Sequence, residues 1–122
     1  MSWDSADLDH FAESEEVHVG SYRADGRLRP LIPIWAVRVG TDLYVRSALG
    51  PEAGWFRRAM AGTARLEAGG TGVDATLQPV ADPALNEQVS QAYRTKYHGH
   101  GSSLRTMVSA PAVDTTVRVV PR

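Results

Sequence analysis

The chain has 122 residues, 43% of them hydrophobic, and a formal net charge of −1, values typical of one soluble globular domain. The near-zero charge excludes broad electrostatic capture of nucleic acid, and no apolar run reaches the roughly 18 residues of a membrane helix. Without cysteine there is no disulfide, thiolate metal site or thiol nucleophile. The acidic start does not form a signal peptide, so we expect a single cytoplasmic domain over residues 1–122.

The first elements predicted along the chain are a short helix and a strand. Asp4 is a suitable N-cap for the helix, and residues 17–22 alternate between apolar and small or polar side chains. Asp25-Gly26 then supplies the turn residues of a hairpin.

The next predicted strand, residues 31–39, is apolar on both of its faces. Trp35, Val37 and Val39 share one face, and Ile32, Ile34 and Ala36 share the other. A strand of this kind is covered twice, here by a barrel interior and by something packed outside the barrel. Pro33 cannot donate to a ladder, so we expect this end of the strand at a sheet edge or bulge.

A short turn leads from this strand to another over residues 43–47. We expect Val39 opposite Leu43, which places Tyr44 and Arg46 on the face away from the barrel interior.

The rest of the chain completes a small antiparallel barrel of α+β class. It has about six strands, one long helix and two short helices. The remaining elements are a helix over 55–61, strands over 63–68 and 73–79, a long helix that begins at Asp82-Pro83, a loop at 98–103 and a last strand over 113–120.

A candidate anion site lies where the strand over 43–47 ends. Arg46 and Ser47 offer a guanidinium fork and a hydroxyl, and the helix that follows carries Arg57 and Arg58 close to its positive end. The alternative is that Arg46 pairs with a carboxylate such as Glu52 and that the other two arginines are simply solvated.

Two tryptophans are candidates for the wall of a binding pocket. Trp35 and Trp55 have flat aromatic surfaces that suit a flat ring ligand, and ordinary core packing is the alternative for both.

The four histidines do not predict a metal site. His98 and His100 flank a glycine in a loop, with no acidic ligand at helical spacing. Either histidine, or Tyr97, is a candidate proton donor to a cofactor or substrate. No nucleophile motif is present, and the catalytic residues stay unassigned.

Several segments together resemble a small bacterial family of unknown function. They include IWAVRVGTDLYVRS, GWFRRA, DPALNEQVSQAYRTKY and TTVRVVPR, and the resemblance extends over nearly the whole chain. That family is similar to the split β-barrel flavin-binding proteins, close to pyridoxamine-phosphate-oxidase-like and deazaflavin-dependent nitroreductase-like proteins.

The resemblance implies a homodimer that binds FMN or a deazaflavin coenzyme in a groove between subunits and acts as an oxidoreductase on a small molecule. Cofactor contacts are implied for Arg46, Ser47, Arg57 and Arg58 at the anionic tail and for Trp35, Trp55 and Tyr44 around the ring. Two alternatives stay open: a non-catalytic protein of the same fold that binds flavin, haem or a small ligand, and a cofactor-free enzyme that uses the groove. We expect no nucleic-acid or membrane partner.

Overall fold

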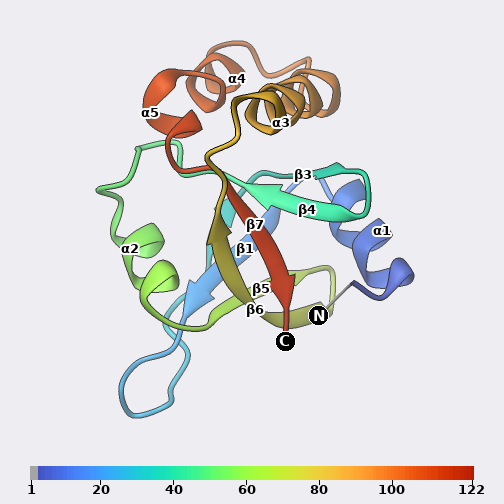
Figure 1. The fold of residues 1–122 in the computed structure, drawn as a ribbon. Helices are drawn as coiled ribbons and strands as arrows, with labels where there is room; N and C mark the ends of the chain where they lie inside the picture. Colours follow the sequence, from blue (N-terminus) through green and yellow to red (C-terminus); the bar gives the residue numbers. More distant parts are fainter. Residues whose placement is uncertain (1–2) are drawn as a thin grey trace.

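A single antiparallel sheet curls into a nearly closed barrel, with helices packed around it (Figure 1). The computed structural model describes residues 3–122, which form seven strands and five helices. The strands are β1 Val17–Ser21, β2 Ile32–Ile34, β3 Ala36–Val39, β4 Asp42–Val45, β5 Ala64–Ala68, β6 Thr71–Pro79 and β7 Val117–Pro121. The helices are α1 Ser5–Glu13, α2 Gly54–Ala61, α3 Pro83–Lys96, α4 Gly101–Met107 and α5 Ala110–Val113. The predicted α+β class and split-barrel architecture are confirmed.

Trp35 is the residue at which the barrel closes. The sheet order is β2-β1-β5-β6-β7-β4-β3, so β2 and β3 are its two edges, yet only Trp35 separates them in the sequence. The single strand predicted over 31–39 is therefore two strands, and this division raises the count from about six to seven. Pro33 lies in edge strand β2, as predicted, where one side of the strand has no neighbour to bond.

The hairpin between β3 and β4 is tighter than predicted. Val39 pairs with Asp42 rather than Leu43, and Ala36 pairs with Val45. The two-residue turn begins at Gly40, whose φ of 62° lies in the region that such turns require and that glycine adopts without strain. Residues 46 and 47 therefore follow the end of β4 instead of belonging to it.

Two aspartates cap helices where the sequence predicts them. The Asp4 carboxylate accepts hydrogen bonds from the backbone N–H groups of Ala6 and Asp7 at the start of α1. The Asp82 carboxylate accepts from the N–H of Ala84 at the start of α3. Each carboxylate satisfies N–H groups that have no partner inside the helix, and its charge suits the positive helix end.

Helices α4 and α5 lie between the predicted long helix and the predicted last strand, where the sequence predicted only a loop over residues 98–103. The predicted loop is helical from Gly101 onward, and β7 begins at Val117 rather than Val113. Pro111 lies in the first turn of α5, where its fixed φ favours a helix. The predicted strand therefore began four residues too early, and its first residue, Val113, is the last residue of α5.

Two apolar clusters lie on opposite faces of β3 and β4, which confirms the double cover predicted from the sequence. The barrel interior holds Val17, Val19, Ile34, Ala36, Leu43, Val45, Leu66, Leu77, Val117 and Val119, closed off by residues of α1 and α2 such as Phe11 and Phe56. The outer cluster joins Val37 and Tyr44 to Val89, Tyr93, Tyr97 and Met107 beneath α3 and α4.

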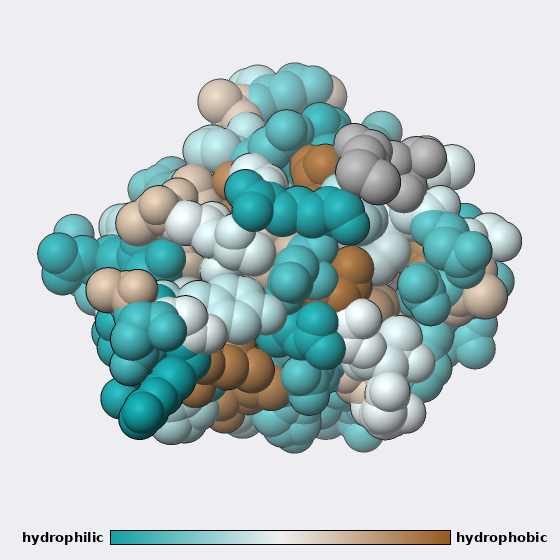
Figure 2. Space-filling model, turned by 90° about the horizontal axis from the view of Figure 1, so that it is seen from below, coloured by the Kyte–Doolittle hydropathy of each residue, from teal (hydrophilic) through white to brown (hydrophobic). Residues whose placement is uncertain are grey.

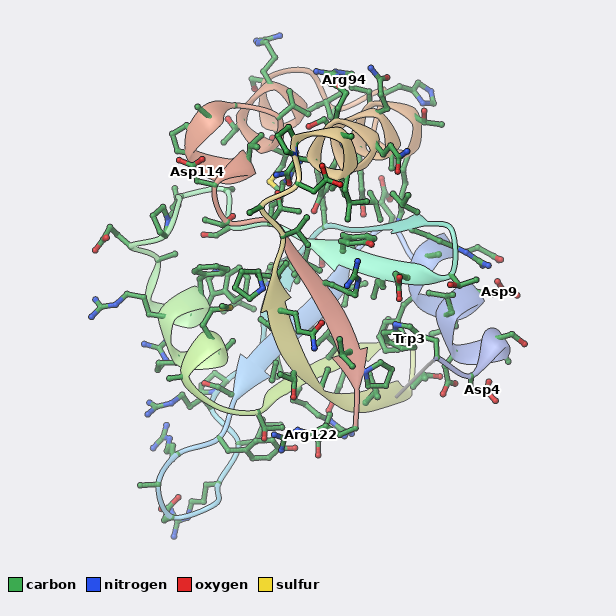
Figure 3. The ribbon with its side chains drawn as sticks, in the orientation of Figure 1. Trp3, Asp4, Asp9, Arg94, Asp114 and Arg122 are labelled. Atoms are coloured by element: carbon green, nitrogen blue, oxygen red, sulfur yellow. The ribbon has the colours of Figure 1, made fainter. Side chains whose placement is uncertain are left out.

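The face opposite α3, α4 and α5 is mainly hydrophilic, with small separate apolar patches (Figure 2). At the amino-terminal end, Trp3 lies against the barrel and its indole N–H donates to the Val119 carbonyl at 3.0 Å (Figure 3). No helix among residues 3–122 is long and apolar enough to cross a membrane.

Candidate functional site

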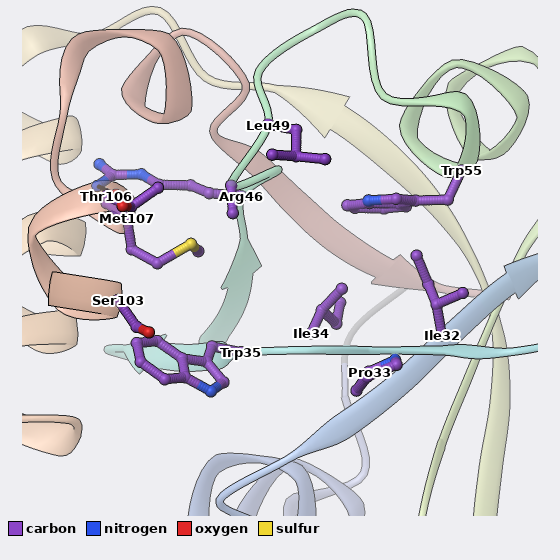
Figure 4. Close-up of a pocket in the computed structure, with 11 residues that line it drawn as sticks. Ile32, Pro33, Ile34, Trp35, Arg46, Leu49, Trp55, Ser103, Thr106 and Met107 are labelled. Atoms are coloured by element: carbon purple, nitrogen blue, oxygen red, sulfur yellow. Dashed lines mark hydrogen bonds between the residues drawn. The ribbon is translucent and has the colours of Figure 1, made fainter. Parts of the chain in front are cut away.

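An open groove of about 440 Å³, which we call the tryptophan groove, lies beside the point where the barrel closes. Trp55 of α2 stands at one side and α4 at the other, with the chain around the β2–β3 junction between them (Figure 4). Its apolar lining comes mainly from Ile32, Ile34, Trp35, Leu49, Trp55 and Met107. Ser103 and Thr106 of α4 add hydroxyl groups.

Trp35 is held firmly in the wall of this groove. Its ring stacks on Tyr97 with centroids 4.0 Å apart and planes within 5°, and it meets the His100 ring edge to face with centroids 5.0 Å apart. Its carbonyl accepts a hydrogen bond from the Tyr93 hydroxyl at 2.9 Å. Contacts with Tyr93 and Tyr97 at the end of α3 therefore fix Trp35 between β2 and β3, and its indole lines the groove.

Trp55 is placed by the first turn of α2. Its ring meets Phe56 edge to face, with centroids 5.6 Å apart, and it packs against the barrel core while it also lines the groove. The two alternatives weighed for the tryptophans are therefore not exclusive, since Trp35 and Trp55 each take part in an apolar cluster and in the groove wall.

Arg46 lines the groove, but its guanidinium points away from Trp55 and toward Thr106 and Met107 at the end of α4 (Figure 4). The side chain is only 1% exposed, and burial lowers its pKa from the ordinary value. It makes no ion pair with the described carboxylates, Glu52 included. Four hydrogen bonds go instead to uncharged oxygens of the protein.

Ser47 and Tyr44 do not line the groove. The Ser47 hydroxyl is buried and finds no hydrogen-bond partner in the described residues. Tyr44 is buried in the outer cluster beneath α3, and its hydroxyl accepts from the Arg118 guanidinium at 3.3 Å.

Arg57 and Arg58 are exposed and line a second, shallow groove together with Gly54 and Ala61 of α2, which we call the α2 groove. Gly54 and Trp55 are consecutive residues, so the two grooves flank the same first turn of α2. No side chain caps this helix at Ala53. The structure therefore brings Trp35, Trp55 and Arg46 to one groove and leaves the other two arginines at its neighbour.

The candidate proton donors lie behind or outside the groove. Tyr97 is fully buried, its hydroxyl donates to the Glu15 carbonyl at 2.6 Å, and burial raises its pKa. His100 hydrogen-bonds the Glu15 carboxylate at 2.9 Å, and His98 contacts the Thr95 carbonyl at 3.1 Å. Within residues 3–122, no group of three His, Asp or Glu residues could hold a metal ion.

The α4 wall is the part of the site that sequence reasoning missed. Ser103, Thr106 and Met107 line the groove, although the sequence predicted a loop that reaches into this segment. Leu49 was also missed; it stands 84% exposed beside the groove in the loop after β4. The available signal was a pair of apolar residues, Leu104 and Met107, at helical spacing, which is short and weak evidence.

The chain belongs to a bacterial family described as "Uncharacterized protein conserved in bacteria (DUF2255)", whose model matches residues 7–119. Among curated proteins, no relative matches the sequence.

Several solved structures share the fold. A conserved hypothetical protein from Mycobacterium tuberculosis aligns over 100% of this chain and 82% of its own, with a TM-score of 0.69 and 15% identity. An F420 reductase aligns over 93% and 91%, with a TM-score of 0.58 and 13% identity. An FAD binding protein from Mycobacterium smegmatis aligns over 99% and 91%, with a TM-score of 0.60 and 12% identity. At these identities the likeness shows the fold alone, a split barrel used by flavin- and deazaflavin-binding proteins.

Proposed function

We propose that this member of the family binds a flavin or deazaflavin cofactor in the tryptophan groove and acts as an oxidoreductase on a small molecule. The observation that carries the proposal is the pair of indoles, Trp35 and Trp55, that wall an apolar groove of about 440 Å³. Small-molecule sites typically measure about 300–1,000 Å³ and are lined in this way. Structures of the same fold include an F420 reductase and an FAD binding protein.

The groups present fit such a cofactor in two parts. The tryptophan groove suits a flat ring system, because its walls are aromatic and aliphatic and its polar lining includes the hydroxyls of Ser103 and Thr106. The α2 groove suits an anionic tail, because Arg57 and Arg58 are exposed there and make no ion pair with the described carboxylates.

When bound, the cofactor would supply hydride or electron transfer, and the chain's own residues would provide position and exclusion of water. Trp35 and Trp55 would hold the ring, and Met107 would keep water from its α4 side. The hydroxyls of Ser103 and Thr106 would hydrogen-bond a polar edge of the ring or of the substrate. This scheme requires no nucleophilic side chain.

We further propose that two copies pair along the open side of the groove. Leu49 supports this arrangement, because it is 84% exposed beside an open apolar groove. Burial of this side chain by a partner would stabilise the dimer by about 1.5–3 kcal/mol. Sedimentation velocity tests the pairing, and the mass of a single chain at micromolar concentration would reject it.

Titration with FMN, and separately with a deazaflavin coenzyme, tests cofactor binding. We expect saturable quenching of tryptophan fluorescence at micromolar concentration. The quenching should shrink in Trp35→Phe and Trp55→Phe, because these two indoles line the groove. Trp3→Phe is the matched control, since Trp3 contacts β7 and does not line the groove. Absence of saturable binding by both cofactors, or equal quenching in all three variants, would reject the proposal.

A second candidate function is the binding of an uncharged flat ligand without turnover. The observation that favours it is the state of Arg46, the one charged residue that lines the tryptophan groove within the described chain, whose donors are mostly engaged by the protein. Tighter binding of riboflavin than of FMN, with no reduction by a nicotinamide nucleotide, would support this candidate.

A further inference from the structure

Arg46 ties three separate segments of the chain to the end of β4. Its Nε donates to Thr116 Oγ1 at 2.8 Å, immediately before β7. Nη1 donates to Ser90 Oγ of α3 at 2.9 Å and to the Met107 carbonyl of α4 at 3.1 Å. Nη2 donates to the Asn86 carbonyl of α3 at 2.9 Å. One buried side chain thus joins the barrel to the helical layer that covers it.

These bonds leave Arg46 little capacity to contact a ligand. A guanidinium has five N–H donors, and four of them have acceptors inside the protein. The side chain is 1% exposed. A ligand anion that took these donors would strand buried acceptors, each at a cost comparable to a lost hydrogen bond.

Helix α4 is the wall of the groove to which Arg46 donates a hydrogen bond directly. It begins at Gly101, with φ of 47°, and the preceding His100 provides no side-chain cap. The Met107 carbonyl lies in its last turn, where carbonyl groups lack partners within the helix and a cation is favourable. Arg46 supplies both the donor and the cation at that end.

We infer that Arg46 is a positioning residue that holds α4 against the barrel and thereby sets the width of the tryptophan groove, rather than a ligand contact. A lysine cannot replace it, because one ammonium cannot reach acceptors on three separate segments. The part of the inference that concerns ligands rests on the proposed function, whereas the part that concerns α4 does not.

Hydrogen exchange followed by mass spectrometry tests the tether without any ligand. We expect amides of residues 102–108 to exchange at least about tenfold faster in Arg46→Lys than in the wild type, while amides of β5 and β6 keep their rates. Ser90→Ala is a milder variant that removes one acceptor outside the groove, and we expect about a threefold effect at the same amides. If Arg46→Lys shows no cooperative unfolding, and is therefore not folded, the exchange rates of Ser90→Ala decide whether the tether holds α4.

Titration with FMN and with riboflavin, which lacks the phosphate, separates positioning from contact. A displaced α4 wall weakens the binding of both flavins by the same factor, and we expect Arg46→Lys to lose at least about tenfold in affinity for each. Arg57→Ala is the contrasting variant, and it should weaken the binding of FMN and leave the binding of riboflavin unchanged.

Unchanged exchange at α4 in both variants would overturn the inference. A loss confined to FMN in Arg46→Lys would overturn it as well, because it would make Arg46 a phosphate contact. If the wild type binds neither these flavins nor a deazaflavin coenzyme, the proposed function fails, and the exchange experiment alone decides the role of Arg46.

Discussion

Lys96, at the end of α3, makes the stability of this protein depend on pH in a direction that can be measured. Its ammonium donates to the Ala36 carbonyl at 2.6 Å and lies 5.1 Å from the centre of the Tyr97 ring. Burial lowers the pKa of Lys96 from 10.5 to about 8, against a smaller opposite effect of Glu15. In the folded protein the charged form is therefore disfavoured relative to the unfolded chain.

The sign and size of the effect follow from linkage. Between pH 8 and 10.5 the unfolded chain binds more protons at this site than the folded protein, so the free energy of unfolding rises with pH. From pH 7 to pH 9 the two pKa values predict a gain of about 1.3 kcal/mol. Solvent screening of a partly buried ammonium reduces this to about 1 kcal/mol.

Urea unfolding at pH 7 and pH 9 measures the gain, and Lys96→Met is the matched control because its side chain has similar length and no charge. The sequence has no cysteine to titrate in this range, and the terminal amine is common to both proteins. We expect about 1 kcal/mol of added stability in the wild type at pH 9 and almost none in the variant. An equal gain in both proteins, or no gain in the wild type, would refute the assignment to Lys96.

Two further substitutions test the core and the proposed pairing. Phe11→Ala should lower the free energy of unfolding by about 3–5 kcal/mol, because Phe11 is fully buried where α1 closes the barrel; a loss under about 1 kcal/mol in urea unfolding would contradict this packing. Leu49→Glu should convert the proposed dimer to a single chain in sedimentation velocity while cooperative unfolding is retained, since a carboxylate cannot be buried unpaired at an interface; a dimer that persists would place the interface elsewhere.

The sequence by itself determined two helix caps and the double apolar cover of residues 31–39. Asp4 and Asp82 cap the helices that they were predicted to cap, because a cap needs only a side chain and the N–H groups next to it. The double apolar pattern of residues 31–39 likewise predicted a chain covered on both faces, and the two clusters confirm it. These features depend on neighbours within a few residues or on a simple period of two.

Only the tertiary structure decided where that apolar stretch divides and what Arg46 does. Trp35 separates two strands because the barrel closes there, a consequence of how seven strands pair across the whole chain. Arg46 bonds Ser90 and Thr116, which lie 44 and 70 residues away, so its local pattern beside Ser47 could not reveal that its donors are engaged. Such long-range contacts form only when the helical layer packs on the barrel, and the groove that they shape belongs to the folded chain.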